Sequence, residues 1–375
     1  MFKEYLLSLE ITQDYKPYEI GSSLEKFVSK LPSLEGKKAA IIGIPEGRYN
    51  PNNEPTANAP EKIRNELYRL SSNSFIENRI VDLGNIKLGK TKEDTFSALK
   101  HVCKYLHDQD IVTILIGGNV ALSEAVYQSF SSDEQNMDLT FISSKLPILE
   151  GELLDRIIKN EENHLINLNA IAFQSHCIPP KALDVIQNLS FGHVRLGALK
   201  KNIDEAELLI RNSNMIVFDV NAVKYSEAPG NQTSNPIGID GDMACQLAWY
   251  SGVSDASKNF GLFDTNPSLD LRNVTSKLMS LILWYFIDGL ANRKHDHPKL
   301  HEEFTNYRCH FDNNHSDIIF HKSKRTSRWW MEIPHPRSLN NSDMNVIIPC
   351  SYEDYQEATS GNIPDRFLNA LQQLH

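Results

Sequence analysis

The sequence has few of the features that would place it outside the ordinary globular proteins. Its five cysteines form no C-x-x-C pair, and their odd number is typical of reduced thiols rather than of a disulfide framework. No run of 18 apolar residues occurs, so no membrane-spanning helix is expected. Residues 1–15 do not combine a basic start, an apolar run and a small-residue cleavage site. We therefore expect a cytoplasmic location.

The sequence also has fewer basic residues than acidic residues. Lys and Arg number 38 against 48 Asp and Glu, which gives a formal net charge of −10. A chain with this balance is repelled by phosphate backbones and by anionic lipid, which argues against a nucleic-acid or membrane partner. The 375 residues are 41% hydrophobic and 23% charged, the composition of a soluble globular protein that can bury a large core.

Short apolar runs of strand length alternate with amphipathic segments of helix length over about residues 38–290. The expected strands are Lys38–Ile44, Arg79–Leu83, Ile111–Ile116, Asp138–Ile142, Leu165–Phe173, His193–Leu196, Met215–Asp219 and Asn259–Asp264. The expected helices between them are Ala59–Leu70, Thr91–His107, Val120–Phe130, Glu152–Lys159, Pro180–Leu189, Asp204–Arg211 and Asp240–Gly252. This alternation predicts an α/β fold, a three-layer α/β/α sandwich around an eight-stranded, mostly parallel sheet.

Three segments are expected along the chain. Residues 1–37 form an N-terminal segment, residues 38–300 the α/β domain, and residues 301–375 a C-terminal extension with short strands. Within the domain, Leu271–Leu290 is the most apolar helix, but its charged residues favour a buried packing helix over a membrane span. Asp204, followed three residues later by Glu207, predicts a helix N-cap with a capping box.

Ligands of open parallel sheets bind beyond the carboxyl ends of the strands, so the residues that follow each strand are the candidate site. Four such turns contain motif-like sequences. They are Gly117-Gly118-Asn119-Val120, Ser143-Ser144-Lys145-Leu146-Pro147, the stretch from Asp219-Val220-Asn221 to Ala228-Pro229-Gly230, and Asp264-Thr265-Asn266-Pro267-Ser268-Leu269-Asp270.

In wording and order, this series resembles the signatures of the ureohydrolases, the family of arginase, agmatinase and formimidoylglutamase. Those signatures are G-G-D-H, D-A-H-x-D, S-x-D-x-D-x-x-D-P followed by A-P-G, and E-x-N-P-x-x-D. The resemblance covers about residues 38–290 and is nearest the formimidoylglutamase-like branch. It implies an arginase-like fold, a homo-oligomer, and a two-manganese site whose bridging hydroxide attacks an amidine or guanidinium carbon.

Most of the metal-ligand positions implied by the resemblance hold other residues here. The His of the first motif falls on Val120, and its neighbouring Asp on Asn119. The second motif's Asp, His and Asp fall on Ser143, Lys145 and Pro147. In the third and fourth motifs the carboxylates fall on Asp219, Asn221 and Asp264, the last of these replacing a Glu.

Of the six ligand positions only Asp219 keeps its family identity, and one carboxylate does not offset the desolvation of two divalent ions. An ammonium roughly 4 Å from a divalent cation is opposed by about 8 kcal/mol at an effective dielectric near 20. We therefore expect no metal cofactor at these vestigial positions, and no catalytic residue is assigned. A Lys145–Asp219 ion pair is expected to fill the metal space, with backbone capping by Asp219 as the equally weighted alternative.

Other candidate groups are interpreted as structural. Val120 and Pro147 are expected to pack, and Cys177 to be a core cysteine. The histidines of residues 295–301 are assigned to a solvated linker, and His310, His315 and His321 are not assigned to a metal site either. Trp329-Trp330 is interpreted as the apolar seam by which the extension docks, although a partner-binding surface is the alternative.

Together these points favour a catalytically inactive ureohydrolase homologue with a binding or structural role. The alternative is an active, divergent C–N hydrolase of amidine or guanidine substrates that uses other metal ligands. A third possibility is a module whose important surface is the extension after residue 300. Metal content separates the first two hypotheses.

Overall fold

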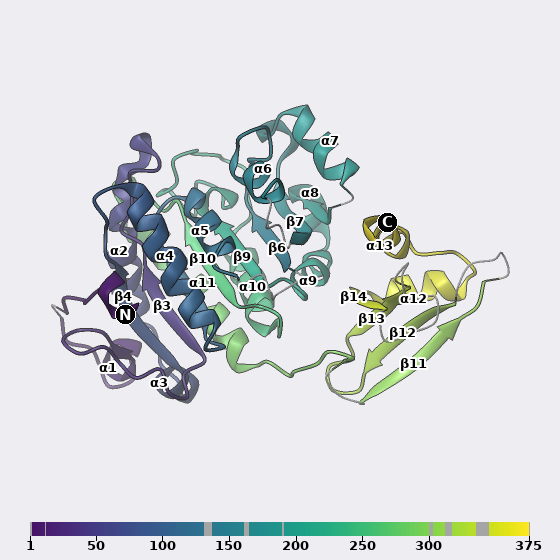
Figure 1. Ribbon diagram of the computed structural model, residues 1–375, viewed down its shortest axis with the longest axis horizontal. Coiled ribbons are helices and arrows are strands. Elements are labelled where there is room, and N and C mark those ends of the chain that lie inside the picture. Colours follow the sequence, from purple (N-terminus) through teal and green to yellow (C-terminus); the bar gives the residue numbers. More distant parts are fainter. Residues whose placement is uncertain are drawn as a thin grey trace.

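The computed structural model describes residues 2–11, 13–130, 137–160, 165–189, 191–299, 303–311, 317–334 and 345–374. Within them the chain forms a large α/β unit and a smaller C-terminal unit, joined by an extended segment (Figure 1). Each unit has its own sheet and its own apolar core.

The large unit is built on a ten-stranded sheet. The strand order is β1-β4-β3-β5-β10-β9-β6-β7-β8, with β2 pairing β4 as well. The strands are β1 (Leu6–Leu7), β2 (Glu25–Lys26), β3 (Ala39–Gly43), β4 (Ile80–Ile86), β5 (Val112–Ile116), β6 (Met137–Ile142), β7 (Leu165–Phe173), β8 (His193–Arg195), β9 (Met215–Asp219) and β10 (Asn259–Phe263). All pairs are parallel except β1 with β4.

The eight strands expected from the sequence are therefore present, and the sheet is larger than expected by two. Strands β1 and β2 each pair only two residues with β4, so they have no apolar run long enough to signal a strand. Because both join the main sheet, the N-terminal segment is part of the large unit.

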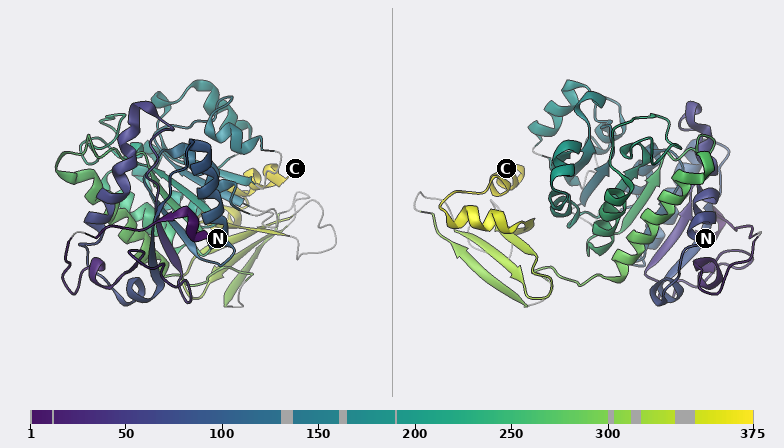
Figure 2. Two further views of the ribbon diagram at one scale, coloured as in Figure 1. Left: turned by 60° about the vertical axis from the view of Figure 1, so that its left-hand side comes forward. Right: turned by 180° about the vertical axis from the view of Figure 1, so that it is seen from behind.

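Helices cover both faces of the sheet. The longer ones are α2 (Ala59–Leu67), α4 (Lys92–His107), α7 (Pro180–Asn188), α9 (Asp204–Ile210), α10 (Gly241–Val253) and α11 (Val274–Ala291). The shorter ones are α1 (Ile20–Ser23), α3 (Ser74–Arg79), α5 (Ser123–Tyr127), α6 (Leu153–Ile158) and α8 (Leu196–Lys201). Helices α4, α5, α6 and α7 pack on one face, and α2, α8, α9, α10 and α11 on the other (Figures 1 and 2).

Alternating residues along each strand serve the two cores. On β3, for example, Ala39 and Ile41 belong to one core while Ala40 and Ile42 belong to the other. The strands are buried on both faces, which explains their near-continuous apolar sequences. The three-layer α/β/α architecture is confirmed.

Helix α11, with the short turn before it, is long and apolar enough to cross a membrane by length and composition: an 18-residue window within residues 271–291 has a mean hydropathy of 1.3. In the fold, however, it packs against α10 and α2, and 61% of that window is buried inside the protein. It lies across the back of the sheet in the rear view of Figure 2. It is a packing helix of the core, as the sequence predicts.

The capping box expected at Asp204 is wrong. Asp204 is the first residue of α9, and the residue before it, Ile203, occupies the N-cap position without a side-chain hydrogen bond. Glu207 instead binds the Arg211 guanidinium one turn later, at 2.9 and 2.5 Å. Tertiary pairing has taken the acidic side chain that a capping box would have used.

The C-terminal unit is a four-stranded antiparallel sheet with two helices on one face. The strands, in sheet order, are β11 (Phe304–Cys309), β12 (Ile318–Ser323), β13 (Trp329–Ile333) and β14 (Val346–Cys350). The helices are α12 (Tyr352–Thr359) and α13 (Asp365–Leu374). Trp329 lies in the core of this unit, stacked on Tyr355 with ring centroids 4.8 Å apart.

The C-terminal unit contacts the large unit chiefly at the end of α9. The Arg211 guanidinium lies 4.9 Å from the ring centroid of Trp330 and donates to the carbonyl oxygen of Trp329 at 2.7 Å. Asn212 Nδ2 donates to the carbonyl oxygen of Ile347 at 3.5 Å, and Arg366 pairs with Glu205 at 3.0 Å. Trp330 is thus a docking residue, whereas Trp329 packs inside its own unit.

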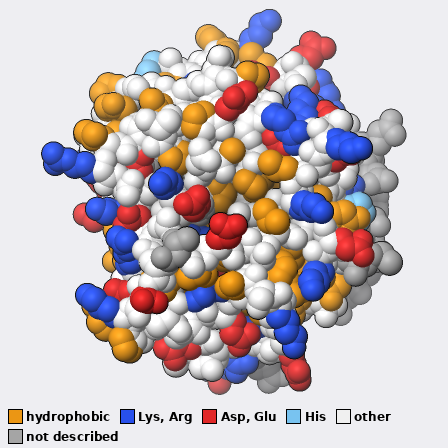
Figure 3. Space-filling view, turned by 90° about the vertical axis from the view of Figure 1, so that its left-hand side faces the viewer, with side chains coloured by type: hydrophobic (Ala, Val, Ile, Leu, Met, Phe, Trp, Pro, Cys, Tyr) orange, Lys and Arg blue, Asp and Glu red, His pale blue; other side chains and the backbone are white. Residues whose placement is uncertain are grey.

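The face of the molecule formed by the N-terminal elements carries charges of both signs. Lys and Arg side chains alternate there with Asp and Glu and with scattered apolar groups (Figure 3). This face therefore presents no field of a single sign to a charged partner.

Candidate functional site

The candidate site is a buried group of five polar side chains, here called the strand-tip cluster. Its members follow or end the adjacent strands β5, β10, β9 and β6, whose carboxyl ends meet at one edge of the sheet. The members are Asn119, Ser143, Asp219, Asn221 and Asp264. None is more than 9% exposed. Residues that are far apart in the sequence therefore converge, as parallel topology requires.

Asp219 is held by three donors of its own chain. Ser143 Oγ donates to Oδ2 at 2.7 Å, and Asn221 donates to Oδ1 through its backbone N at 2.9 Å and its Nδ2 at 2.6 Å. Thr233 Oγ1 in turn donates to Asn221 Oδ1 at 3.1 Å. Burial raises the pKa of Asp219, although these hydrogen bonds and the charge of Lys145 oppose the shift.

Asp264 is the second carboxyl group of the cluster. Asn119 Nδ2 donates to its Oδ1 at 2.6 Å, and the backbone N of Val120 donates to its Oδ2 at 3.4 Å. Burial and then the negative charge of Asp219 raise the pKa of Asp264 to about 8. Asp264 therefore keeps its proton at neutral pH.

The expected Lys145–Asp219 ion pair is wrong. Lys145 is exposed and forms no ion pair with Asp219, although both residues belong to the described part of the chain. Its charge still lowers the pKa of both carboxyls, which shows that it lies near the cluster without contacting it. Hydrogen bonds from Ser143 and Asn221 satisfy Asp219 instead, and an ammonium left in water avoids the desolvation that burial would cost. Asp219 also accepts the backbone N of Asn221, as the capping alternative expected.

Val120 and Pro147 contribute no side-chain donor atoms to the cluster. Val120 is partly buried and packs against the core under α4 and α5. Pro147 is half-buried, and its carbonyl oxygen accepts from the backbone N of Leu154 at 2.8 Å. Both residues have structural surroundings.

The donors at the strand tips do not fit a pair of divalent metal ions. Two carboxyls are present, and each already accepts hydrogen bonds from neighbouring amides or a hydroxyl. In the parts of the chain that the structure describes, no group of three or more His, Cys, Asp or Glu side chains is placed to hold a metal ion. Amide and hydroxyl groups that donate to these carboxylates fill the positions where cations would have to bind.

The motif residues that this chain shares with the ureohydrolase signatures form hydrogen bonds between backbone segments. The backbone N of Gly230 donates to Thr275 Oγ1 at 2.7 Å. The carbonyl oxygen of Gly230 accepts from the backbone N of Asn266, also at 2.7 Å. The carboxylate of Asp270 accepts from the backbone N of Thr275 at 2.7 Å and of Ser276 at 2.8 Å. A Cβ on Gly230 would lie 2.9 Å from Thr275 Oγ1, which explains the glycine. These residues fix the start of α11 relative to the strand tips.

Loops from three parts of the chain are joined beside the cluster. Asn266 Nδ2 donates to Asn53 Oδ1 at 2.6 Å, and Gln232 Nε2 donates to the carbonyl oxygen of Asn52 at 2.9 Å. Asn50 Nδ2 donates to Gln232 Oε1 at 3.3 Å. The Asn-rich segment after β3 is therefore tied to the loops that follow β9 and β10.

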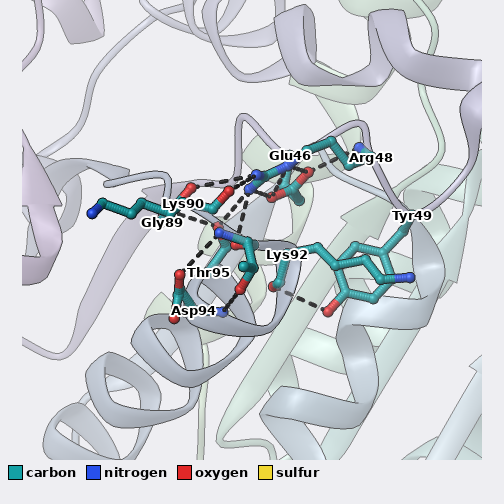
Figure 4. Close-up of polar contacts among 9 residues, drawn as sticks. Glu46, Arg48, Tyr49, Gly89, Lys90, Lys92, Asp94 and Thr95 are labelled. Atoms are coloured by element: carbon teal, nitrogen blue, oxygen red, sulfur yellow. Dashed lines mark hydrogen bonds and ion pairs between the residues drawn. The ribbon is translucent and has the colours of Figure 1, made fainter.

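Sequence reasoning missed another buried carboxylate, Glu46, which follows β3 (Figure 4). Its side chain is fully buried, and Arg48 binds it through Nε at 2.9 Å and Nη2 at 2.5 Å. The same guanidinium donates to the carbonyl oxygens of Lys90 at 3.0 Å and Thr91 at 3.2 Å. Burial alone would raise the pKa of Glu46, but the hydrogen bonds from Arg48 lower it. The only sequence signal for this ion pair was the spacing of Glu46 and Arg48, two residues apart. The pair ties the loop after β3 to the start of α4.

Two of the other sequence-based interpretations need correction. Cys177 is half-buried rather than a core residue, and its Sγ lies 3.6 Å from Asn235 Nδ2. In the 295–301 segment, His295 is exposed, but Asp296 is buried and accepts the hydroxyls of Ser323 and Thr326, so the linker is anchored to the C-terminal unit. His301 and His315 lie outside the described residues.

His310 and His321 have carboxylate partners in the C-terminal unit. His310 Nδ1 lies 2.7 Å from Asp317 Oδ1 at the surface. His321 is nine-tenths buried, with Nδ1 2.8 Å from Asn306 Oδ1 and Nε2 2.8 Å from Glu332 Oε1. Each histidine is thus paired within the sheet.

Curated relatives with sequence similarity to this chain are formimidoylglutamases. The formimidoylglutamase of Bacillus subtilis (strain 168) is 22% identical over 316 residues, which cover 72% of this chain and 96% of that protein. The formimidoylglutamase of Staphylococcus haemolyticus is 24% identical over 246 residues, 61% of this chain and 78% of that protein. No model of a known protein family matches the chain.

Solved structures with the same fold belong to the same group of enzymes. Formimidoylglutamase from Bacillus subtilis superposes with a TM-score of 0.65 at 15% identity, covering 76% of this chain and 95% of that one. Formiminoglutamase from Trypanosoma cruzi gives 0.63 at 18% identity, with 74% and 99% covered. Agmatine ureohydrolase of Thermoplasma volcanium gives 0.57 at 17% identity, with 73% and 94% covered. The chain is thus similar in sequence to formimidoylglutamases, and it shares the fold of these solved ureohydrolase structures.

Proposed function

We propose that this protein has the ureohydrolase fold without the hydrolytic activity of the family, and that it acts by binding or as a structural component. The chemistry of the strand-tip cluster carries the proposal. Asp219 and Asp264 are its carboxyl groups, and amide and hydroxyl donors of the same chain already bind both. A hydroxide bridging two metal ions needs ligands that these positions do not supply.

The decisive measurement is metal content together with activity. The full chain is purified without chelators in the presence of manganese, and bound metal is measured by elemental analysis. We expect well under one manganese per chain and no hydrolysis of formimidoylglutamate, the substrate that the relatives' names indicate. Nearly two equivalents with hydrolysis would instead establish an active, divergent C–N hydrolase.

A restored variant tests whether the loss of ligands is the cause. It combines Val120→His, Ser143→Asp, Lys145→His, Pro147→Asp and Asn221→Asp. If the scaffold still places these positions for two metal ions, the variant gains manganese relative to the natural chain. A control that carries only Lys145→His and Pro147→Asp restores two of the three positions of one turn and should gain less.

A further inference from the structure

A cavity lies at the opposite edge of the sheet from the strand-tip cluster. It has a volume of about 630 Å³ and is lined by the amino ends of β6, β7 and β8, by α9, and by β14, α12 and α13 of the C-terminal unit. We call it the amino-edge cavity. Both units of the chain are needed to form it.

Three hydrogen-bond acceptors line its inner wall. Asp138 on β6 is in register with Asn167 on β7, and Asn169 follows two residues later on the same face of the strand. The Oδ1 atoms of Asn167 and Asn169 are buried and have no hydrogen-bond partner. Buried carbonyl oxygens without a donor are rare, because leaving them unsatisfied destabilises the fold.

The orientation of Asn169 is fixed by its own contacts. Its Nδ2 donates to the carbonyl oxygen of Leu209 at 3.0 Å and to Thr140 Oγ1 at 3.4 Å, so Oδ1 is the atom left over. A Cβ on Gly192, which also lines the cavity, would lie 2.3 Å from this oxygen. Glycine at 192 therefore packs directly beside Asn169 Oδ1, where a larger residue would not fit.

Charge at the cavity is strongly acidic. Carboxylates of Asp138, Glu205, Asp354, Glu357 and Asp365 line it, whereas Arg366 is the one Lys or Arg among the described residues of its wall. That guanidinium is already committed, at 3.0 Å from Glu205 and 3.2 Å from Asp354. Burial raises the pKa of Asp138 to about 7, the shift expected of a carboxyl that loses water without gaining a positive neighbour.

We propose that the amino-edge cavity binds a small organic cation rich in N–H donors, an amine or a guanidinium compound. Such a ligand donates N–H groups to the polar inner wall around Asp138, while its positive charge offsets the surrounding carboxylates. An anion, or a ligand with hydrogen-bond acceptors alone, would bring no donor to this wall. The cavity is remote from the strand-tip cluster, so this proposal stands or falls independently of the proposed function.

The test is a calorimetric titration of the full chain with 1,4-diaminobutane, with 1,4-butanediol as a neutral ligand of matched length. We expect the diamine to bind and the diol not to bind. Asp138→Asn keeps the shape of the side chain but removes its charge, and should weaken diamine binding about tenfold or more. Equal binding of diamine and diol, or no diamine binding at about 10 mM, would overturn the proposal.

Matched variants at the mouth of the cavity locate the binding. Glu357 and Glu353 are exposed residues of the same helix, but Glu353 does not line the amino-edge cavity. Glu357→Gln should weaken diamine binding by about threefold, while Glu353→Gln should leave it unchanged. Equal effects of the two substitutions would contradict the assignment of the binding site. Because both substitutions are at the surface, the site can be tested with them even if the Asp138→Asn variant does not fold.

Discussion

At the scale of single residues, hydrogen bonds from amides and a hydroxyl hold the carboxyl groups of the strand-tip cluster. Asp219 and Asp264 have remained acidic, but Ser143, Asn221 and Asn119 now donate to them. Since amides and hydroxyls carry no charge, they satisfy the carboxyl oxygens without neutralising both groups. The remaining repulsion is relieved by retention of a proton, which makes the cluster sensitive to pH.

The free energy of unfolding should therefore fall as pH rises from about 4 to about 8. The pKa of Asp264 is raised to about 8 in the fold from about 3.9 in the unfolded chain, so the native state binds more proton over that window. Asp264→Asn should flatten this fall by at least about 1 kcal/mol, since one pKa unit corresponds to about 1.4 kcal/mol. Urea unfolding at pH 5 and pH 8 measures the difference.

The control for that measurement is Asp155→Asn. Asp155 is a carboxylate on α6 whose pKa is lowered, chiefly by its hydrogen bond to Lys159, so its substitution should not flatten the fall. If Asp264→Asn and the natural chain lose the same stability between the two pH values, Asp264 does not carry the retained proton.

At the scale of elements, a shared motif residue, Asp270, stabilises the start of α11. Asp270 lies upstream of the helix, and its carboxylate accepts from Thr275 N, Ser276 N and Ser276 Oγ at 2.7, 2.8 and 2.7 Å. The two residues before the helix, Arg272 and Asn273, both have left-handed φ angles, of 57° and 56°. Asp270 thus caps a helix whose approach is strained, which gives this motif residue a structural role.

Asp270→Ala should cost about 2–3 kcal/mol in the free energy of unfolding, because three buried donors lose their acceptor. Asp240→Ala is the matched comparison: Asp240 is the N-cap of α10 and accepts from one backbone N, that of Met243, at 3.0 Å. Its loss should cost about 1 kcal/mol. Chemical denaturation of the two variants measures both values, and an equal cost would contradict the special role of Asp270.

At the scale of the whole molecule, a small set of α9 contacts joins the two units. Glu207 and Arg211 form a buried pair that Arg328 and Trp330 of the C-terminal unit complete. Burial alone would raise the pKa of Glu207, but the charge of Arg211 lowers it. The pair therefore depends on Arg211 for its charge balance, and the docking depends on it for the contact with Trp330.

Arg211→Ala should separate the C-terminal unit from the large unit while each keeps its core. The substitution leaves Glu207 without its main partner and removes the hydrogen bond to the carbonyl oxygen of Trp329. We expect a larger radius of gyration in solution scattering and faster proteolysis near residues 292–303. Arg211→Lys keeps the charge but not the planar stack, and should give a smaller change.

Arg156→Ala is the control for general effects of losing an arginine. Arg156 is largely exposed and pairs with Glu124 at 2.8 Å within the large unit. Its loss should change neither the radius of gyration nor the cleavage rate. An unchanged scattering profile for Arg211→Ala would show that other contacts hold the units together.

The sequence by itself determined the layered architecture. Strand-length apolar runs that alternate with amphipathic segments, as in Ala39–Gly43 followed by Ala59–Leu67, require a sheet covered on both faces. It also determined that Val120 and Pro147 bring no metal ligand, because side-chain chemistry does not depend on the fold. The short strands Leu6–Leu7 and Glu25–Lys26 were not predictable, since their pairing comes from the edge of β4 rather than from their own pattern.

Only the tertiary structure decided how the remaining polar groups are satisfied. Whether Asp219 would pair with Lys145 or with Ser143 and Asn221 depends on loop paths and desolvation, which spacing along the chain does not encode. The same is true of Glu207, which binds Arg211 rather than its own helix start, and of Asn169, whose free oxygen faces a cavity between two units. Local patterns fix which residues are buried together, whereas hydrogen-bond partners are chosen in three dimensions among groups that folding brings near.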